Sequence, residues 1–352
     1  SGLIATNTIA QGNTREQGLD AIVANGSSII RATPSREWPG IAGVTVAEVW
    51  ITKEKWLGDA FINEKLVDEI SPYLTPVGRT IGAPEQLAEN NDFAFQGSNV
   101  LGVGFVLSIE EAKILLLKNS RNSRVVLPFL RGEDFNGRPD QSPAYFIINF
   151  FDWPLNRDVA PAGYLGPVAS DYQECLQIVE TRVKAERLMA KDKAYVERWW
   201  QYARRCESLY SAVEGLNRVI FHAYTSKHIC FSFAPGGIVY AGPHTIIASD
   251  RIEHWGIFQS SLHCEWAWEF SSTMRNSGIR FAPSDVRKFP LPDSRSALAV
   301  VTESQEYFDQ RAAYMVRNTL GLTDTYNRFH NHCDTSWNVT ELRRLHVKVD
   351  QA

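Results

Sequence analysis

The hydrophobic and polar positions of the first fifty residues predict the end of a mixed α/β sheet. Apolar residues over 3–10 predict a strand, and the spacing over 14–24 predicts a helix that ends at Asn25-Gly26. A short strand is expected over 27–32, a turn over 34–40 and a β-branched strand over 43–52. The order is therefore strand, helix, strand, strand.

The middle of the chain combines strands, helices and polar loops. A strand interrupted by glycines is expected over 99–108, followed by a helix over 109–118 for which Ser108 and Glu111 form a capping box. Two strands are expected over 125–130 and 144–151, separated by the polar loop LRGEDFNGRPDQSP. A long helical stretch, in one or two helices, is expected over 171–211.

The last part of the chain is predicted to change from strands to helices. Its short strands are expected over 217–224, 228–233, 238–240 and 245–249. Its helices are expected over 251–269, 296–320 (closed by Gly321) and 340–350. Between the first two helices the segment 271–292 is expected to be a loop that ends at Phe289-Pro290-Leu291-Pro292, because proline interrupts helices. The predicted fold class is α+β.

The composition is that of an ordinary globular protein. The 352 residues suffice for two domains, and 44% are hydrophobic and 22% charged. No apolar run has the length of a membrane span and no signal peptide is recognisable, and five scattered cysteines indicate a reducing compartment. We therefore expect a cytoplasmic protein with no membrane partner. The net charge of −4 neither indicates nor excludes binding to nucleic acid.

The sequence has no familiar catalytic, cofactor or metal motif. It contains no phosphate-binding GxxxxGK[ST] loop, no GxSxG, no HExxH and no pair of CxxC motifs. Gly102-Val103-Gly104 is more typical of a close backbone approach than of a cofactor loop. The cluster His330-Asn331-His332-Cys333 has no separated partner that would complete a metal site and favours a solvated turn. We expect no cofactor and no metal in this chain.

Positive charge collects in two segments. Residues 182–205 contain eight basic and three acidic residues with Trp199 and Trp200 among them. This pattern favours a solvated helix face with buried tryptophans, and it also suits a helix that contacts phosphates. The segment 271–281 contains arginine, asparagine and hydroxyl side chains, which can bind the edges of guanine and adenine.

Several long motifs resemble one protein family. They are LIATNTIAQGNTREQGL, LPFLRGEDFNGRPDQSPAYFIINFFDWPL, VKAERLMAKDKAYVERWWQYARRCESLY, SSLHCEWAW, IRFAPSDVRKFPLP and GLTDTYNRFHN with LRRLHVKVD. In this order they resemble the MmeI-type (type IIL/IIG) restriction–modification proteins. The resemblance implies that residues 1–56 are the distal part of a Rossmann-like, gamma-class adenine-N6 DNA methyltransferase domain. It further implies a target recognition domain over 57–292 and a helical tail over 293–352.

The resemblance also implies that this chain is a fragment that cannot methylate DNA alone. The sequence lacks the NPPF-type catalytic motif and the FxGxG-type motif that holds S-adenosylmethionine in the family. A full-length parent would use S-adenosylmethionine, and Mg²⁺ if it carries a nuclease. The expected partners are double-stranded DNA and the rest of the same polypeptide.

Site residues follow from the resemblance by matching position. In the family the loop before an Arg-Tyr-type pair, here Arg280-Phe281, reads a base pair of the target. Relatives often carry a complementary charged pair where this chain has Asn276 and Gly278. The difference implies either that this chain reads a different base or that Arg275 makes the contact to the base. The full set expected to read bases is Arg275, Asn276, Gly278, Tyr224, Ser226, Lys227, Gly242 and His244. The set expected to contact the DNA backbone is Arg187, Lys191, Lys193, Arg198, Arg204 and Arg280.

Three alternatives remain open at the level of sequence. The turns around 222–227 and 240–244 also fit plain hairpin chemistry. Glu133 and Asp134 are expected to pair with Arg131 or Arg138 or to cap turns. A DNA-facing role for these two arginines stays open. A metal-dependent enzyme could instead use the carboxylates of the GEDFNGRPD motif. The tail helices could instead be the docking surface of a protein-interaction module.

Overall fold

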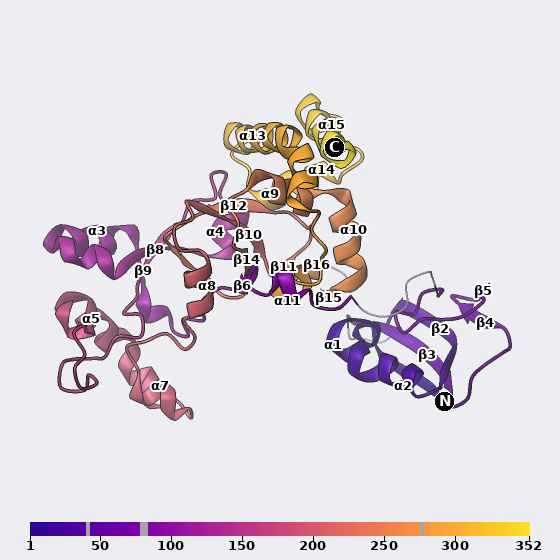
Figure 1. Ribbon diagram of the computed structural model, residues 1–352, viewed down its shortest axis with the longest axis horizontal. Helices are drawn as coiled ribbons and strands as arrows, with labels where there is room; N and C mark the ends of the chain where they lie inside the picture. The colour runs from indigo at the N-terminus through magenta and orange to yellow at the C-terminus, as the bar shows by residue number, and fades with distance from the viewer. Residues whose placement is uncertain (40–42, 78–83, 275–277) are drawn as a thin grey trace. The chain divides into compact units, whose positions relative to one another are not determined.

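The computed structural model describes residues 1–39, 43–77, 84–274 and 278–352, and its fold is α+β, as the sequence predicts (Figure 1). Contacts divide the chain into two units. Unit 1 contains residues 1–90, 225–229 and 261–291, and unit 2 contains residues 91–224, 230–260 and 292–352. The helical tail therefore belongs to the same unit as most of the middle of the chain.

Unit 1 begins with a five-stranded sheet. In sheet order its strands are β1 (Gly2–Thr6), β3 (Thr45–Thr52), β2 (Ser28–Glu37), β4 (Ala60–Ile62) and β5 (Lys65–Val67). Only the pair β2 and β4 is parallel among these strands. A helical segment that comprises α1 (Gly12–Arg15), a π-helical turn over 16–20 and α2 (Ala21–Ala24) supplies Leu19, fully buried, to the core of the sheet. The expected strand, helix and two strands are all present.

The prediction of a turn over 34–40 is wrong for residues 34–37, because β2 continues through Pro34 to Glu37. The pairing of β2 with β3 shifts register between Thr33 and Arg36. Proline has no amide hydrogen to donate, and it is tolerated where a bulge interrupts the hydrogen-bonded ladder.

Unit 1 also contains a small sheet in a region expected to be a loop. In sheet order it consists of β11 (Thr225–Ser226), β16 (Gly278–Arg280) and β15 (Ser272–Met274). The helices α10 (Ser261–Phe270) and α11 (Pro283–Val286) flank β15 and β16 in the sequence. The prediction of a loop over 271–292 was wrong because backbone pairing, with Ser272 opposite Arg280, builds strands from polar residues.

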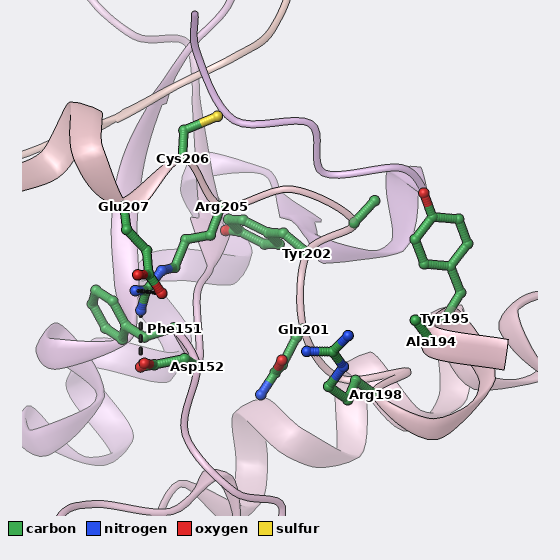
Figure 2. Close-up of a pocket in the computed structure, with 11 residues that line it drawn as sticks. Phe151, Asp152, Ala194, Tyr195, Arg198, Gln201, Tyr202, Arg205, Cys206 and Glu207 are labelled. Carbon is green, nitrogen blue, oxygen red and sulfur yellow. Dashed lines mark hydrogen bonds and ion pairs between the residues drawn. The ribbon is translucent and has the colours of Figure 1, made fainter. Parts of the chain in front are cut away.

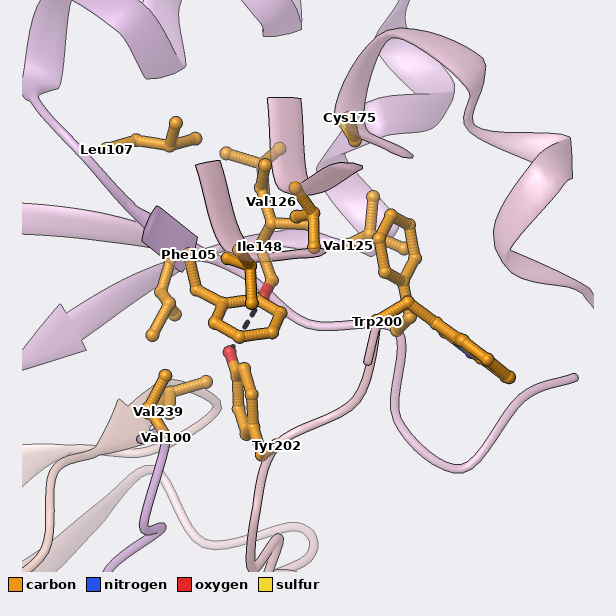
Figure 3. Packing of buried hydrophobic residues seen from close by; sticks show 14 of the residues in the cluster. Val100, Phe105, Leu107, Val125, Val126, Ile148, Cys175, Trp200, Tyr202 and Val239 are labelled. Atoms are coloured by element: carbon orange, nitrogen blue, oxygen red, sulfur yellow. Dashed lines mark hydrogen bonds between the residues drawn. The ribbon is translucent and has the colours of Figure 1, made fainter. Parts of the chain in front are cut away.

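Unit 2 contains a mixed four-stranded sheet with helices packed on it. In sheet order the strands are β13 (Val239–Tyr240), β8 (Val126–Leu130), β9 (Tyr145–Ile148) and β7 (Val106–Leu107). The helices α3 (Ile109–Lys118) and α5 (Gln173–Val179) contribute Leu115 and Cys175 to the core of this sheet. Figure 3 shows Tyr202 within this core, where its hydroxyl donates to the carbonyl of Ile148 at 2.9 Å.

The N-terminal end of α3 is fixed by hydrogen bonds between residues three positions apart. The amide of Glu111 donates to Oγ of Ser108 at 3.1 Å, and the amide of Ser108 donates to Oε2 of Glu111 at 2.8 Å. This pair of bonds is the capping box that the sequence predicts.

The strand expected before α3 was predicted too long, because residues 103–105 form a 3-10 turn and only β7 is extended. A Cβ atom on Gly104 would lie 2.7 Å from the side chain of Val183, so close packing of the segment is confirmed at this glycine.

The helical stretch expected over 171–211 is divided into several pieces. After α5 come a π-helical turn over 180–184, α6 (Ala185–Leu188), α7 (Lys193–Glu197) and α8 (Glu207–Ala212). Residues 198–206 between α7 and α8 are not helical. The expected polar loop over 131–143 also differs, because it contains α4 (Gly132–Gly137).

A second sheet of unit 2 carries the C-terminal helices. Its strands are β12 (Ser232–Pro235), β10 (Arg218–Ala223), β14 (His244–Ile247) and β6 (Ala94–Gln96), all antiparallel to their neighbours. The remaining helices are α9 (Ile252–Gln259), α12 (Ser294–Ala297), α13 (Val301–Asn318), α14 (Leu322–Phe329) and α15 (Trp337–Gln351). Figure 1 shows α13, α14 and α15 gathered beside α9. The long helix ends at Thr319, which has a φ of 54°, and Gly321 precedes α14 instead of closing α13.

Candidate nucleic-acid interface

The tryptophans of the basic segment, residues 182–205, are buried. Trp199 and Trp200 are 6% and 7% exposed, and Nε1 of Trp200 donates to the carbonyl of Trp153 at 2.9 Å. The inward orientation that the sequence favours is therefore confirmed. It anchors the basic segment to the core of unit 2, while most of its charged side chains lie at the surface.

Apart from the buried Arg187, the cations of the basic segment fall into two groups. Arg182 pairs with Glu111, Lys184 with Glu180, and Arg205 with both Asp152 and Glu207. Four others are exposed, and their side chains form no hydrogen bond or ion pair within the described ranges: Lys191, Lys193, Arg198 and Arg204. These four are the cations of the basic segment that can accept phosphate partners without first breaking an ion pair.

Arg187 was expected to contact the DNA backbone, and the structure corrects this expectation. The residue is 3% exposed, and its Nη2 donates to the carbonyls of Val100 at 2.9 Å and Leu101 at 2.7 Å. Its guanidinium lies over the rings of Phe105 and Tyr195. Burial lowers the pKa of Arg187. The side chain therefore holds the chain at 100–101 to the end of α6.

A polar cavity of about 220 Å³ opens next to the basic segment (Figure 2). Arg198, Tyr195 and Gln201 line it on one side, and Arg205, joined to Asp152 at 2.9 Å, lines it on another. These residue types bind anions and nucleobases rather than supply a nucleophile. Consistent with this, burial raises the pKa of the thiol of Cys206, which also lines the cavity.

Two residues that line this cavity have an unusual backbone. Phe151 and Cys206 have φ values of 55° and 62°, in the left-handed region that bulky residues rarely adopt. The amide of Phe151 donates to Oδ1 of the buried Asn149 at 2.9 Å, which supports its conformation. No pattern in the sequence indicates this cavity, because its residues come from segments about fifty positions apart.

In unit 1 the candidate base-reading residues gather on the small sheet. Arg280 is exposed in the central strand β16, between Thr225 of β11 and Ser272 of β15. Gly278, on the same strand, is buried, and a Cβ atom there would lie 2.7 Å from the carbonyl oxygen of Ser226. Gly278 therefore allows two strands to approach and offers no group to a base. The expected readers Arg275 and Asn276 lie outside the described residues.

The turn that follows β11 is built by hairpin chemistry. Oγ of Ser226 donates to the carbonyl of His228 at 2.7 Å and accepts from the amide of His228 at 3.3 Å. This bonding supports the structural alternative for Ser226, as a residue that fixes the turn. Lys227 is exposed within it, whereas Tyr224, just before β11, is half-buried.

The second group of expected base readers lies inside unit 2. His244 is 8% exposed, its Nδ1 donates to the carbonyl of Ala241, and its ring stacks on Phe221 with centroids 5.0 Å apart. Burial lowers the pKa of His244, which keeps the ring neutral. Gly242 is half-buried and its amide donates to the carbonyl of Ser98 at 2.8 Å. The expectation that His244 reaches a base is therefore corrected, because its polar edge packs within the protein.

The acidic motif around α4 is structural, as expected. Nε of Arg131 lies 3.3 Å from Oδ2 of the buried Asp134, and its guanidinium lies 3.8 Å from the centre of the Tyr145 ring. Arg138 in turn lies 3.6 Å from Asp140. Among the described residues no group of three or more His, Cys, Asp or Glu side chains could hold a metal ion.

Comparison with known proteins relates the fold to restriction–modification enzymes. No protein-family model and no curated protein matches the sequence. The solved structure of the type IIL restriction–modification enzyme MmeI in complex with DNA matches with a TM-score of 0.72 and 14% identity, over 99% of this chain and 46% of that chain. The type IIG restriction endonuclease BpuSI matches over the same shares at 10% identity, with a TM-score of 0.33 that is too low to carry an argument.

The fold resemblance expected from the sequence motifs is thereby confirmed. This chain has the fold of a part of MmeI and spans less than half the length of that chain. In the part of the chain that the structure describes, none of the helices is both long and apolar enough to cross a membrane.

Proposed function

We propose that this chain binds double-stranded DNA and is the sequence-recognition part of a restriction–modification protein. The observation that carries the proposal is the fold match to MmeI, which was solved bound to DNA. The four exposed cations of the basic segment support it, because counterion release makes unpaired lysine and arginine side chains the main source of affinity for DNA.

In this proposal the two units divide the work. Lys191, Lys193, Arg198 and Arg204 of unit 2 contact phosphates and fix the register on the duplex. Selection of the sequence belongs to unit 1, where Arg275 and Asn276 lie between β15 and β16 in the sequence and where Arg280 is exposed. Each bidentate contact to a base would discriminate by about 1–3 kcal/mol.

Methyl transfer is no part of the activity proposed for this chain. Adenine-N6 methylation with S-adenosylmethionine is proposed for a longer protein that contains the chain. The chain has neither the NPPF-type motif nor the FxGxG-type motif that the resemblance associates with that cofactor, so its residues do not fit the cofactor.

A salt titration of DNA binding tests the role of unit 2. Arg198→Ala and Arg204→Ala should each weaken binding to all duplexes alike and reduce the slope of log K against log salt by about 0.9 per lost phosphate contact. Arg344→Ala is the matched control, because Arg344 is an exposed arginine of α15 that pairs with Glu341. Equal slopes for all three variants and the unchanged chain would contradict the proposal.

Sequencing of methylated bases tests the role of unit 1. In a host that expresses the full gene, we expect N6-methyladenine at one defined motif. Replacing Asn276 should change that motif while methylation continues, because asparagine and its substitutes form different bonds with base edges. An unchanged motif at normal activity would show that a different loop selects the sequence, and a complete absence of modified adenine would contradict the methyltransferase part.

A further inference from the structure

Four exposed apolar side chains lie on the two segments that the hydrogen bond from Arg187 to Leu101 joins. Leu101 and Val103, in the loop before β7, are 47% and 88% exposed. Leu188 and Met189, which follow Arg187 at the end of α6, are 52% and 81% exposed. We call these four residues the apolar cluster. Arg187 joins the two segments by donating to the carbonyls of Val100 and Leu101. Exposed aliphatic side chains on two joined segments are typical of a contact surface.

The loop that carries half of the apolar cluster is held firmly in place. At its start, Asn99 and Arg204 exchange two backbone hydrogen bonds of 2.9 and 3.0 Å. Arg187 then binds the carbonyls of the next two residues, and Gly104 packs against the π-helical turn over 180–184. Leu101 has a φ of 45°, a conformation that costs a bulky residue about 1–3 kcal/mol and persists only where the surroundings impose it. The protein therefore displays these apolar side chains on a rigid support.

Cations lie on or beside the segments that carry the apolar cluster. Lys191 and Lys193 follow Met189 within four positions, and Arg204 lies beside Asn99, at the start of the loop. All three are exposed, and their side chains have no ion-pair partner among the described residues. Asp192, between the two lysines, is occupied as the cap of α7. Apolar side chains accompanied by cations are complementary to an opened base step of a duplex, whose unstacked base faces are apolar and whose backbone is anionic.

We propose that the apolar cluster inserts between base pairs of bound DNA, with Val103 and Met189 as the wedge. The two side chains would unstack one base step and kink the duplex, while Lys191 and Lys193 hold the phosphates on either side. Aliphatic wedges flanked by cations kink DNA in this way in architectural proteins. This inference rests on the proposed function, because it adds DNA distortion to the same interface.

The test compares the whole chain with the double variant Val103→Ala, Met189→Ala. Both side chains are more than four-fifths exposed, so their truncation should leave the fold intact. Leu165→Ala, at a 95% exposed leucine outside the cluster, is the matched control. The DNA is a duplex selected from a random library by the unchanged chain, with a fluorophore pair at its ends to report bending and 2-aminopurine to report unstacking.

We expect the unchanged chain and the control to increase both signals and the double variant to lose most of each. The double variant should bind the intact duplex about tenfold more weakly and a duplex with a one-nucleotide gap less than about twofold more weakly, because the gap makes the kink easy. Its salt slope should stay unchanged, since no cation is removed.

Three results would overturn the wedge, and they are distinguishable. If the unchanged chain binds no duplex, the proposed function fails together with the wedge. If it binds with a normal salt slope but the double variant bends and unstacks DNA as well as the unchanged chain does, the wedge alone fails. If the double variant loses binding to phosphatidylserine vesicles and keeps its full effect on DNA, the apolar cluster belongs to a lipid surface.

Discussion

Replacing Arg187 with alanine should destabilise unit 2 and leave the electrostatic attraction to DNA unchanged. The substitution removes the donor to the carbonyls of Val100 and Leu101, now bonded at 2.9 and 2.7 Å, and a buried carbonyl without a donor costs about 1–3 kcal/mol. It also leaves a gap beside the ring of Phe105. Part of the loss is offset because a buried guanidinium no longer has to be desolvated. We expect the free energy of unfolding to fall by about 2–4 kcal/mol.

Urea unfolding followed by tryptophan fluorescence measures this change, because Trp199 and Trp200 are buried in the same unit. Arg187→Met keeps part of the packing without the hydrogen bonds and should recover only part of the loss. Arg198→Ala is the control at an exposed arginine and should change the free energy of unfolding by less than about 0.5 kcal/mol. The reasoning is refuted if Arg187→Ala unfolds at the same urea concentration as the unchanged chain and lowers the salt slope of DNA binding, because a phosphate contact alone has that signature.

Three further substitutions test the structure elsewhere. Gly278→Ala should destabilise unit 1 by about 1–3 kcal/mol in thermal unfolding, because its Cβ would lie 2.7 Å from the carbonyl oxygen of Ser226. An unchanged melting temperature would show that the two strands do not approach this closely. Arg343→Ala should cost about 1–3 kcal/mol in urea unfolding, because Arg343 donates to four backbone carbonyls in the last residues of α14 and the segment after it. An equal midpoint would show that these bonds contribute nothing. Burial lowers the pKa of His222 to about 4 from its usual 6.5. Between pH 6.5 and about pH 4 the unfolded chain therefore binds a proton that the folded chain does not. The free energy of unfolding should fall as the pH falls through this range. His222→Asn, which can still donate to the carbonyl of Cys230, should flatten this pH dependence, and equal slopes for both proteins would disprove the assignment.

The elements that the sequence predicts best are those set by neighbouring residues. The capping box of Ser108 and Glu111 needs four consecutive positions and appears as expected. The strand β2 passes through Pro34 because its pairing with β3 shifts register there, and the residues around Pro34 alone do not contain that information. The small sheet over 272–280 similarly depends on pairing with β11, about fifty residues earlier in the chain. Long-range backbone pairing is therefore what the sequence left undetermined.

The sequence identifies the cations of the basic segment, and the structure decides which of their side chains are exposed. Sequence reasoning placed phosphate contacts between residues 182 and 205, where four exposed and unpaired cations lie. It could not distinguish base contact from turn construction at Ser226, because a hydroxyl serves both purposes equally well. The cavity beside Arg198 was missed, since Tyr195 and Arg205 face it together with residues from around Phe151.

The error at Arg187 has a physical cause that the sequence does contain. Val179, Val183 and Arg187 are spaced four residues apart and are 0%, 1% and 3% exposed, so they lie on one buried face of the helical stretch. An arginine that continues an apolar stripe has its stem among hydrophobic side chains and its guanidinium directed at whatever acceptors the core provides. In this protein the acceptors are backbone carbonyls at 100–101, which explains how a cation is tolerated without a carboxylate bonded to it. Charge counted along a segment predicts where DNA contacts can arise, and helical spacing decides which of those charges reach the surface.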